Sequence, residues 1–149
     1  MAHVEIGQKR KSLVQKTEGL KLVDPVLRPW FETWSVLHSR PIPLYCTVGS
    51  FTQTGFLANR ILVETVINLA RDLGVQKFAE FGSGIGNFTL PLAEICTSVD
   101  AYEIDALALE GLRRSSTELG LEKNIVINQG DYQNSKRADA LDFSSVDSI

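Results

Sequence analysis

Three glycines on alternate positions, Gly82, Gly84 and Gly86, follow directly after a short apolar run that contains one carboxylate, Glu80. Glycine lets the backbone turn sharply and approach a ligand that any Cβ would block. The residues after Asn87 suit a helix, whose first N–H groups have no intrahelical partners and can bind an anion. The order strand, glycine turn, helix therefore predicts an α/β fold with a nucleotide-type cofactor site at the turn.

Apolar runs that predict strands alternate with stretches that predict helices on both sides of this turn. The predicted strands are 78–81, 99–104 and 125–128, and the predicted helices are 56–73, 87–95 and 107–119. Residues 144–149 predict the beginning of a fourth strand. This alternation is typical of a parallel sheet with right-handed crossovers and flanking helices. We expect the sheet to be incomplete, with either self-association through its last strand or poor order near residues 132–149.

The first 50 residues differ from the rest, since they hold four of the five prolines and both tryptophans. Val26, Trp30, Trp34 and Leu37 are spaced by four, four and three residues, which predicts one face of a helix that begins near Pro25. A short extended segment over 44–48 follows. We therefore expect a linking segment with a Trp-bearing helix over residues 1–50, and a partial cofactor-binding domain over 51–149.

Composition narrows the class of protein. The net charge of −3 gives the whole chain no nucleic-acid signature, although basic residues gather between Lys9 and Lys21. That stretch is either a solvated face or a phosphate-contacting arm. Cys46 and Cys96 are too few for a metal cluster and are expected to be reduced and buried. With no signal peptide and no apolar run of the roughly 20 residues that a membrane span needs, we expect a cytoplasmic protein.

The details of the glycine turn separate the cofactor classes. The dinucleotide fingerprint GxGxxG would place a glycine at Asn87, and the turn has no P-loop Gly-Lys-Ser/Thr, which disfavours a triphosphate. Glu80 supplies a carboxylate where strands that bind NAD usually carry an apolar residue. The methionine ammonium of S-adenosylmethionine explains that carboxylate, so the sequence favours S-adenosylmethionine over NAD.

Two further acids close the next two predicted strands. A carboxylate at Glu103 can accept both hydroxyls of a ribose 2′,3′-diol, and Asp131 can accept an exocyclic adenine amine. Either acid alone is better explained as a solvated residue at a strand end. Together with Glu80 and the glycines they fall at three successive carboxyl ends of one sheet, where ligands bind in open α/β folds.

Two stretches carry a resemblance to a known family. Ser50-Phe51-Thr52-Gln53, then a helix, then Gly84-Ile85-Gly86-Asn87-Phe88-Thr89-Leu90-Pro91-Leu92-Ala93 resembles the RNA uracil-C5 methyltransferases that make 5-methyluridine. The resemblance covers roughly residues 50–149 and is closest to the enzymes that act on large-subunit ribosomal RNA, with the transfer-RNA enzymes next. It implies a class I methyltransferase Rossmann-like fold, of which this chain holds a part.

The resemblance also implies roles for individual residues. Cofactor contacts would come from Gln53, the Gly82 position, Asn87, Glu103 and Asp131, and the flipped-out base would lie near Phe51 and Gln53. The implied chemistry is attack of a cysteine thiolate on uracil C6, methyl transfer to C5 and removal of the C5 proton by a carboxylate. Extrusion of the base is needed because C5 and C6 are inaccessible in a stacked strand.

The sequence also departs from the family's pattern. Gly82-Ser83 stands where the family usually has an aromatic residue and a cysteine, and Gly55 replaces the asparagine that follows Phe-x-Gln. The family's Asp-Pro-Pro-Arg motif, nucleophile and base follow the fourth strand, and neither Cys46 nor Cys96 fits the nucleophile position. We therefore expect no catalytic residue in this chain and no activity from it alone. A non-catalytic nucleotide- or RNA-binding module and a methyltransferase of another specificity remain as alternatives.

Overall fold

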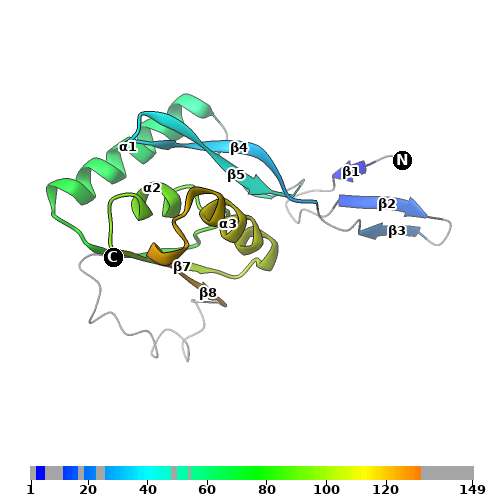
Figure 1. Ribbon diagram of the computed structural model, residues 1–149. Helices are drawn as coiled ribbons and strands as arrows, with labels where there is room; N and C mark the ends of the chain where they lie inside the picture. The colour runs from blue at the N-terminus through cyan, green and yellow to red at the C-terminus, as the bar shows by residue number, and fades with distance from the viewer. Residues whose placement is uncertain are drawn as a thin grey trace.

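The computed structural model describes residues 3–5, 12–16, 19–22, 26–47, 50–53 and 55–131 (Figure 1). Three short antiparallel strands form the first sheet, with β2 in the centre: β1 (His3–Glu5), β2 (Ser12–Lys16) and β3 (Gly19–Leu22). The predicted fourth strand at 144–149 and the basic residues Lys9 to Lys11 lie outside the described residues.

The predicted parallel sheet is present. Its strands are β6 (Lys77–Phe81), β7 (Ser98–Glu103) and β8 (Ile125–Gln129), hydrogen-bonded in that order and all parallel. The helices and the short 3-10 turn around them are α1 (Phe56–Asp72), α2 (Thr89–Ala93), α3 (Ala106–Leu119) and η1 (Glu122–Asn124). The α/β class and the three strands are confirmed, while α2 is shorter than the predicted helix because the glycine loop continues to Phe88. Self-association through the sheet edge stays a prediction.

Local sequence explains where the longer helices begin and end. Asp105 starts α3, and its carboxylate accepts hydrogen bonds from the backbone N–H groups of Leu107 and Ala108. Gly120 ends this helix in the left-handed conformation, with φ of 69°, and Gly74 follows α1 with φ of 67°. Both helix ends therefore come from residues whose signal is readable in the sequence.

The predicted Trp-bearing helix is wrong. Residues 26–37 instead contribute β4 (Arg28–Ser35), which pairs antiparallel with β5 (Arg40–Cys46). Pro41 and Pro43 lie in β5 although they have no N–H to donate. An edge strand tolerates proline, and β5 is an edge strand because it pairs with β4 alone. The spacing of the tryptophans was compatible with a helix, but strand pairing and burial of alternate β4 side chains decided the conformation.

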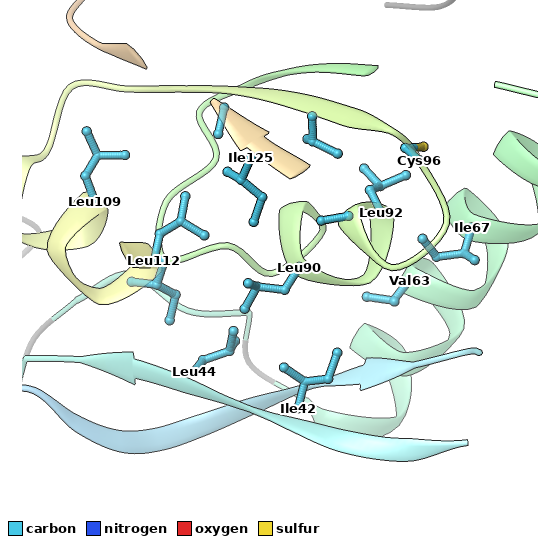
Figure 2. Close-up of a cluster of buried hydrophobic side chains, with 14 of the residues drawn as sticks. Ile42, Leu44, Val63, Ile67, Leu90, Leu92, Cys96, Leu109, Leu112 and Ile125 are labelled. Carbon is cyan, nitrogen blue, oxygen red and sulfur yellow. The ribbon is translucent and has the colours of Figure 1, made fainter. Parts of the chain in front are cut away.

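The β4–β5 hairpin shares one core with the parallel half. Figure 1 shows the hairpin on one side of α2 and α3 and the parallel sheet on the other. In Figure 2, Ile42 and Leu44 of β5 point toward Leu90 of α2 and Leu112 of α3, and all four side chains are buried. These side chains pack across position 50, where the sequence predicts a domain boundary. The boundary itself stays a prediction.

One close approach fixes the hairpin on α3. A Cβ at Gly111 would lie 2.1 Å from the backbone oxygen of Tyr45, so only glycine fits at this point of the helix. Nearby, the hydroxyl of Ser115 accepts a hydrogen bond from the Tyr45 N–H at 3.0 Å. The hairpin and helix therefore touch through their backbones.

Two further expectations concern the cysteines and membranes. Cys46 and Cys96 are buried and do not form a disulfide with each other, as expected. Within the described part of the chain, no helix has the length and apolar character needed to cross a membrane. The cytoplasmic location stays a prediction.

Candidate functional site

A pocket lies at the glycine loop, between β4, the segment 50–53, the start of α1 and the carboxyl end of β6. It brings together six of the residues that the sequence singled out, namely Phe51, Gln53, Glu80, Gly82, Gly84 and Asn87. Its other lining residues include Phe31, Glu32, Thr52, Asn59, Ser83 and Phe88. The sequence missed Phe31 and Glu32 because it assigned them to a helix.

The three glycines of the loop have different structural reasons. All have positive φ, which is 75° at Gly82, 56° at Gly84 and 95° at Gly86. Gly84 faces open space and lines the pocket, so its lack of a Cβ leaves room for a ligand. A Cβ at Gly86 would lie 2.5 Å from Leu112 Cδ1, so this glycine allows the loop to pack on α3. Of the three, Gly86 does not line the pocket, and its cofactor contact stays a prediction.

Glu80 lines the pocket and is half-buried. Its pKa is raised to about 7, chiefly by burial; a hydrogen bond donated by the Thr89 hydroxyl partly opposes this rise in pKa, and the negative charge of Glu103 adds to it. The sequence missed Thr89, although a hydroxyl in the first turn after a glycine loop is well placed to reach back to the strand. A cation bound beside Glu80 would favour its ionised form.

Glu103 holds the glycine loop in place. One carboxylate oxygen accepts a hydrogen bond from the Gly84 N–H at 2.9 Å, and the other accepts from the N–H groups of Ile104 and Asp105 at 2.7 and 2.9 Å. The side chain therefore connects the ends of two neighbouring strands. Glu103 does not line the pocket, so its contact with a ribose stays a prediction.

Asp131 follows β8 and is exposed. The preceding residue ties this strand end to the next one, because the Gly130 N–H donates to the Glu103 backbone oxygen at 3.0 Å. Asp131 therefore lies at the expected edge of the sheet but outside the pocket lining, and its contact with an adenine stays a prediction.

Asn87 connects three elements around the pocket. Its side-chain amide exchanges two hydrogen bonds of 2.9 Å with the amide of Asn59 on α1. Its backbone oxygen accepts a 2.7 Å hydrogen bond from the Thr33 hydroxyl on β4. Asn59 and Thr33 are both buried, and neither contact has a local signal in the sequence, because each depends on pairing between distant segments. Asn87 thus positions the pocket walls in addition to lining the pocket.

The two cysteines lie away from this site. Neither lines the pocket, and burial raises the pKa of the Cys46 thiol to about 11. Such a thiol stays protonated and is a poor nucleophile. The Cys96 thiol donates to the backbone oxygen of Val75 at 3.7 Å. Both cysteines are therefore packing residues in this structure.

The chain was compared with known proteins. No protein-family model matches it. It is 40% identical over 150 residues to a Bdellovibrio bacteriovorus protein named as an uncharacterized RNA methyltransferase. The matched region covers 97% of this chain and 38% of that protein. It is 38% identical over 80 residues to the 23S rRNA (uracil-C5)-methyltransferase RlmD of Nitrosospira multiformis, over 54% of this chain and 18% of that enzyme. The chain thus spans less than half the length of either relative.

A solved structure supports the fold. The SAH-bound methyltransferase PaMTH1 of Podospora anserina superposes with a TM-score of 0.51 at 18% identity, over 56% of this chain and 36% of that one. The predicted partial Rossmann-like methyltransferase fold is confirmed. The two sequence relatives, each matched over part of its length, are both named as RNA methyltransferases, and the resemblance predicted from the sequence is confirmed.

Proposed function

We propose that the pocket binds S-adenosylmethionine and that this chain is the cofactor-binding part of an RNA uracil-C5 methyltransferase acting on ribosomal RNA. One observation carries the proposal: Gln53 and Phe51, which precede α1, line the same pocket as Glu80 and Gly84, which follow β6. The names of the two sequence relatives support an RNA substrate, and RlmD supports ribosomal RNA.

The cofactor-binding residues divide the work. Glu80 would bind the methionine ammonium, because its buried carboxyl group gains most from a cationic partner. Gly84 gives the ligand access to the loop backbone, and Glu103 keeps that backbone in position through the Gly84 N–H. The bound cofactor would supply an electrophilic methyl group.

The substrate side would use Phe51 and Gln53. Phe51 is exposed at the pocket and offers an aromatic surface, while the amide of Gln53 can both donate to and accept from a base edge. Neither Cys46 nor Cys96 lines the pocket, so we propose that this chain does not methylate RNA by itself. Methylation of a uridine-containing RNA by the purified chain without another protein would contradict this proposal.

Calorimetric titration with S-adenosylhomocysteine tests the cofactor site. We expect the wild-type chain to bind it, and Glu103→Ala to weaken binding by about 10- to 100-fold, since the variant loses charge-assisted hydrogen bonds that shape the loop. Glu110→Ala is the matched control, because Glu110 is an exposed acid on the neighbouring helix. Thermal unfolding of each variant checks that the fold is kept.

The same titration separates the alternatives. Absence of S-adenosylhomocysteine binding by a folded wild-type chain would refute the proposed cofactor. Binding of AMP or NAD with equal affinity would instead favour the non-catalytic nucleotide-binding module.

A further inference from the structure

Phe31 occupies an unusual position on β4. It pairs across the hairpin with Leu44 and shares the inward face of β4 with Thr33 and Ser35. Leu44, Thr33 and Ser35 are all buried. Phe31 itself is 44% exposed although it faces the same way. Phe31 also lines the pocket, so part of its ring is open to the pocket space.

The strand is irregular at this point. The register of β4 against β5 shifts between Pro29 and Phe31, so that Trp30 is an extra residue without a cross-strand partner. Such a bulge changes the direction of the side chains beside it and is frequent next to functional sites. The bulge therefore sets where the Phe31 ring lies relative to the pocket.

The same strand is tied to the glycine loop. Two residues after Phe31, the Thr33 hydroxyl donates to the Asn87 backbone oxygen at 2.7 Å. Asn87 is in turn paired with Asn59 of α1. The Phe31 ring is therefore attached to a fixed part of the pocket wall, which lowers the entropy cost of using it to hold a ligand.

We infer that Phe31 is a base-contacting residue, and that the flipped-out nucleobase enters between Phe31 of the hairpin and the segment that carries Phe51 and Gln53. The inference rests on the proposed function and adds a second wall to its substrate site. Aromatic side chains bind unstacked bases through their faces, whichever base is present. Phe31, Phe51 and Gln53 line this pocket, whereas Glu103 and Asp131, the predicted partners of the cofactor's ribose and adenine, do not.

The test measures binding of a fluorescein-labelled oligouridylate of about six nucleotides to the whole chain at saturating S-adenosylhomocysteine. We expect Phe31→Ala to weaken this binding by roughly 5- to 100-fold, the usual effect of removing one aromatic stacking partner. Binding of an abasic oligonucleotide of the same length should not change. Trp30→Ala is the matched control, because Trp30 is adjacent, 54% exposed and outside the pocket lining.

Each outcome decides one point. Equal losses in Phe31→Ala and Trp30→Ala, or no loss in Phe31→Ala, would overturn the inference, because Phe31 would then have no special contact. A loss of S-adenosylhomocysteine affinity in Phe31→Ala would also overturn it, by placing Phe31 on the cofactor. Wild-type binding of cofactor without oligouridylate refutes the base site alone, whereas binding of neither refutes the proposed function. If Phe31→Ala unfolds, Phe31→Leu, which keeps the apolar volume and removes the ring face, replaces it.

Discussion

The β4–β5 hairpin and the glycine-loop half of the molecule, β6 to β8, meet at one pocket but are specified differently. The glycine loop is defined by consecutive residues, whose positive φ angles and backbone bonds to β7 give it its shape. The hairpin is defined by contacts with residues far along the chain, at Gly111, Asn87 and Glu94. Local signals thus identify the glycine-loop side of the pocket, and only tertiary packing identifies the hairpin side.

The two halves also differ in what holds them. Parallel strands β6 and β7 pair residue for residue without a register shift. The hairpin instead has a bulge in β4, and hydroxyl groups on its inward face make specific bonds, such as that from Ser35 to Glu94 at 2.6 Å. Loss of a hairpin contact should therefore shift the hairpin side of the pocket without disrupting the parallel sheet.

The largest expected effect is at the contact between the hairpin and α3. Gly111→Ala would place a methyl group 2.1 Å from the Tyr45 backbone oxygen, and a backbone atom cannot move away cheaply. We expect the free energy of unfolding to fall by about 2 to 3 kcal/mol, net of the roughly 1 kcal/mol that alanine gains over glycine in a helix. Urea denaturation measures the change.

The neighbouring residue provides the control for that variant. Glu110→Ala is also on α3 but at an exposed position, so it should change stability by less than about 0.5 kcal/mol. Equal stability of Gly111→Ala and the wild type would mean that the hairpin does not press on α3, and the shared core would need to be reconsidered.

The next effect separates two glycines of one loop. Gly86→Ala meets Leu112 and must hold a positive φ, so we expect a loss of about 2 kcal/mol in stability. Gly84→Ala has open space and should cost only about 1 kcal/mol from its left-handed backbone. Its effect on S-adenosylhomocysteine affinity should nevertheless be larger, by about tenfold or more, because its Cβ points to the ligand space. Identical profiles for the two variants would contradict separate roles.

The third effect is a pH dependence from Glu80. Its folded pKa of about 7 lies above the ordinary 4.5, so the folded chain binds the proton more tightly than the unfolded chain. The stability from this group is complete below pH 4.5 and is lost as the pH rises toward 7, by about 1 kcal/mol between pH 6 and pH 7. Glu80→Gln should remove this slope in urea titrations.

Cofactor binding should show the opposite slope. A cationic ammonium prefers ionised Glu80, so the affinity for S-adenosylhomocysteine should rise as the pH approaches 7 and then level off. Affinity that falls over this range, or a slope that survives in Glu80→Gln, would show that Glu80 does not bind the ammonium.

Sequence reasoning succeeded where the signal was local. The glycine turn, the three strands and the helix ends at Gly74 and Gly120 depend on residues close together in the chain, so their patterns could be read directly. The hairpin was misassigned because Trp30 and Trp34 are four residues apart, a spacing that is typical of one helix face. The residues that hold them in a strand lie far away in the sequence. In the structure the Cζ atom of Arg60 lies over the Trp34 ring, 3.8 Å from the ring centroid. No local sequence pattern predicts this contact.

The same limit applied within the site. Glu80 and Gly84 were found because glycine and carboxylate patterns are specific. Asn59 and Phe31 line the pocket, and Thr33 hydrogen-bonds to its wall at Asn87, but all three were missed because each contact forms only after a distant segment has folded against it. The side of the pocket that we propose for the cofactor could therefore be predicted from the sequence, and the side that we propose for the substrate only in part.

The smallest expected effect is the coupling between Asn59 and Asn87, which joins α1 to the glycine loop. Their two mutual amide hydrogen bonds of 2.9 Å should give a coupling free energy of about 0.5 to 1 kcal/mol in a double-mutant cycle of Asn59→Ala and Asn87→Ala. The cycle is measured once by urea denaturation and once by S-adenosylhomocysteine affinity. Coupling in both means that the pair positions the pocket wall, whereas coupling in stability alone would limit Asn59 to packing α1 and leave the ligand contact to Asn87.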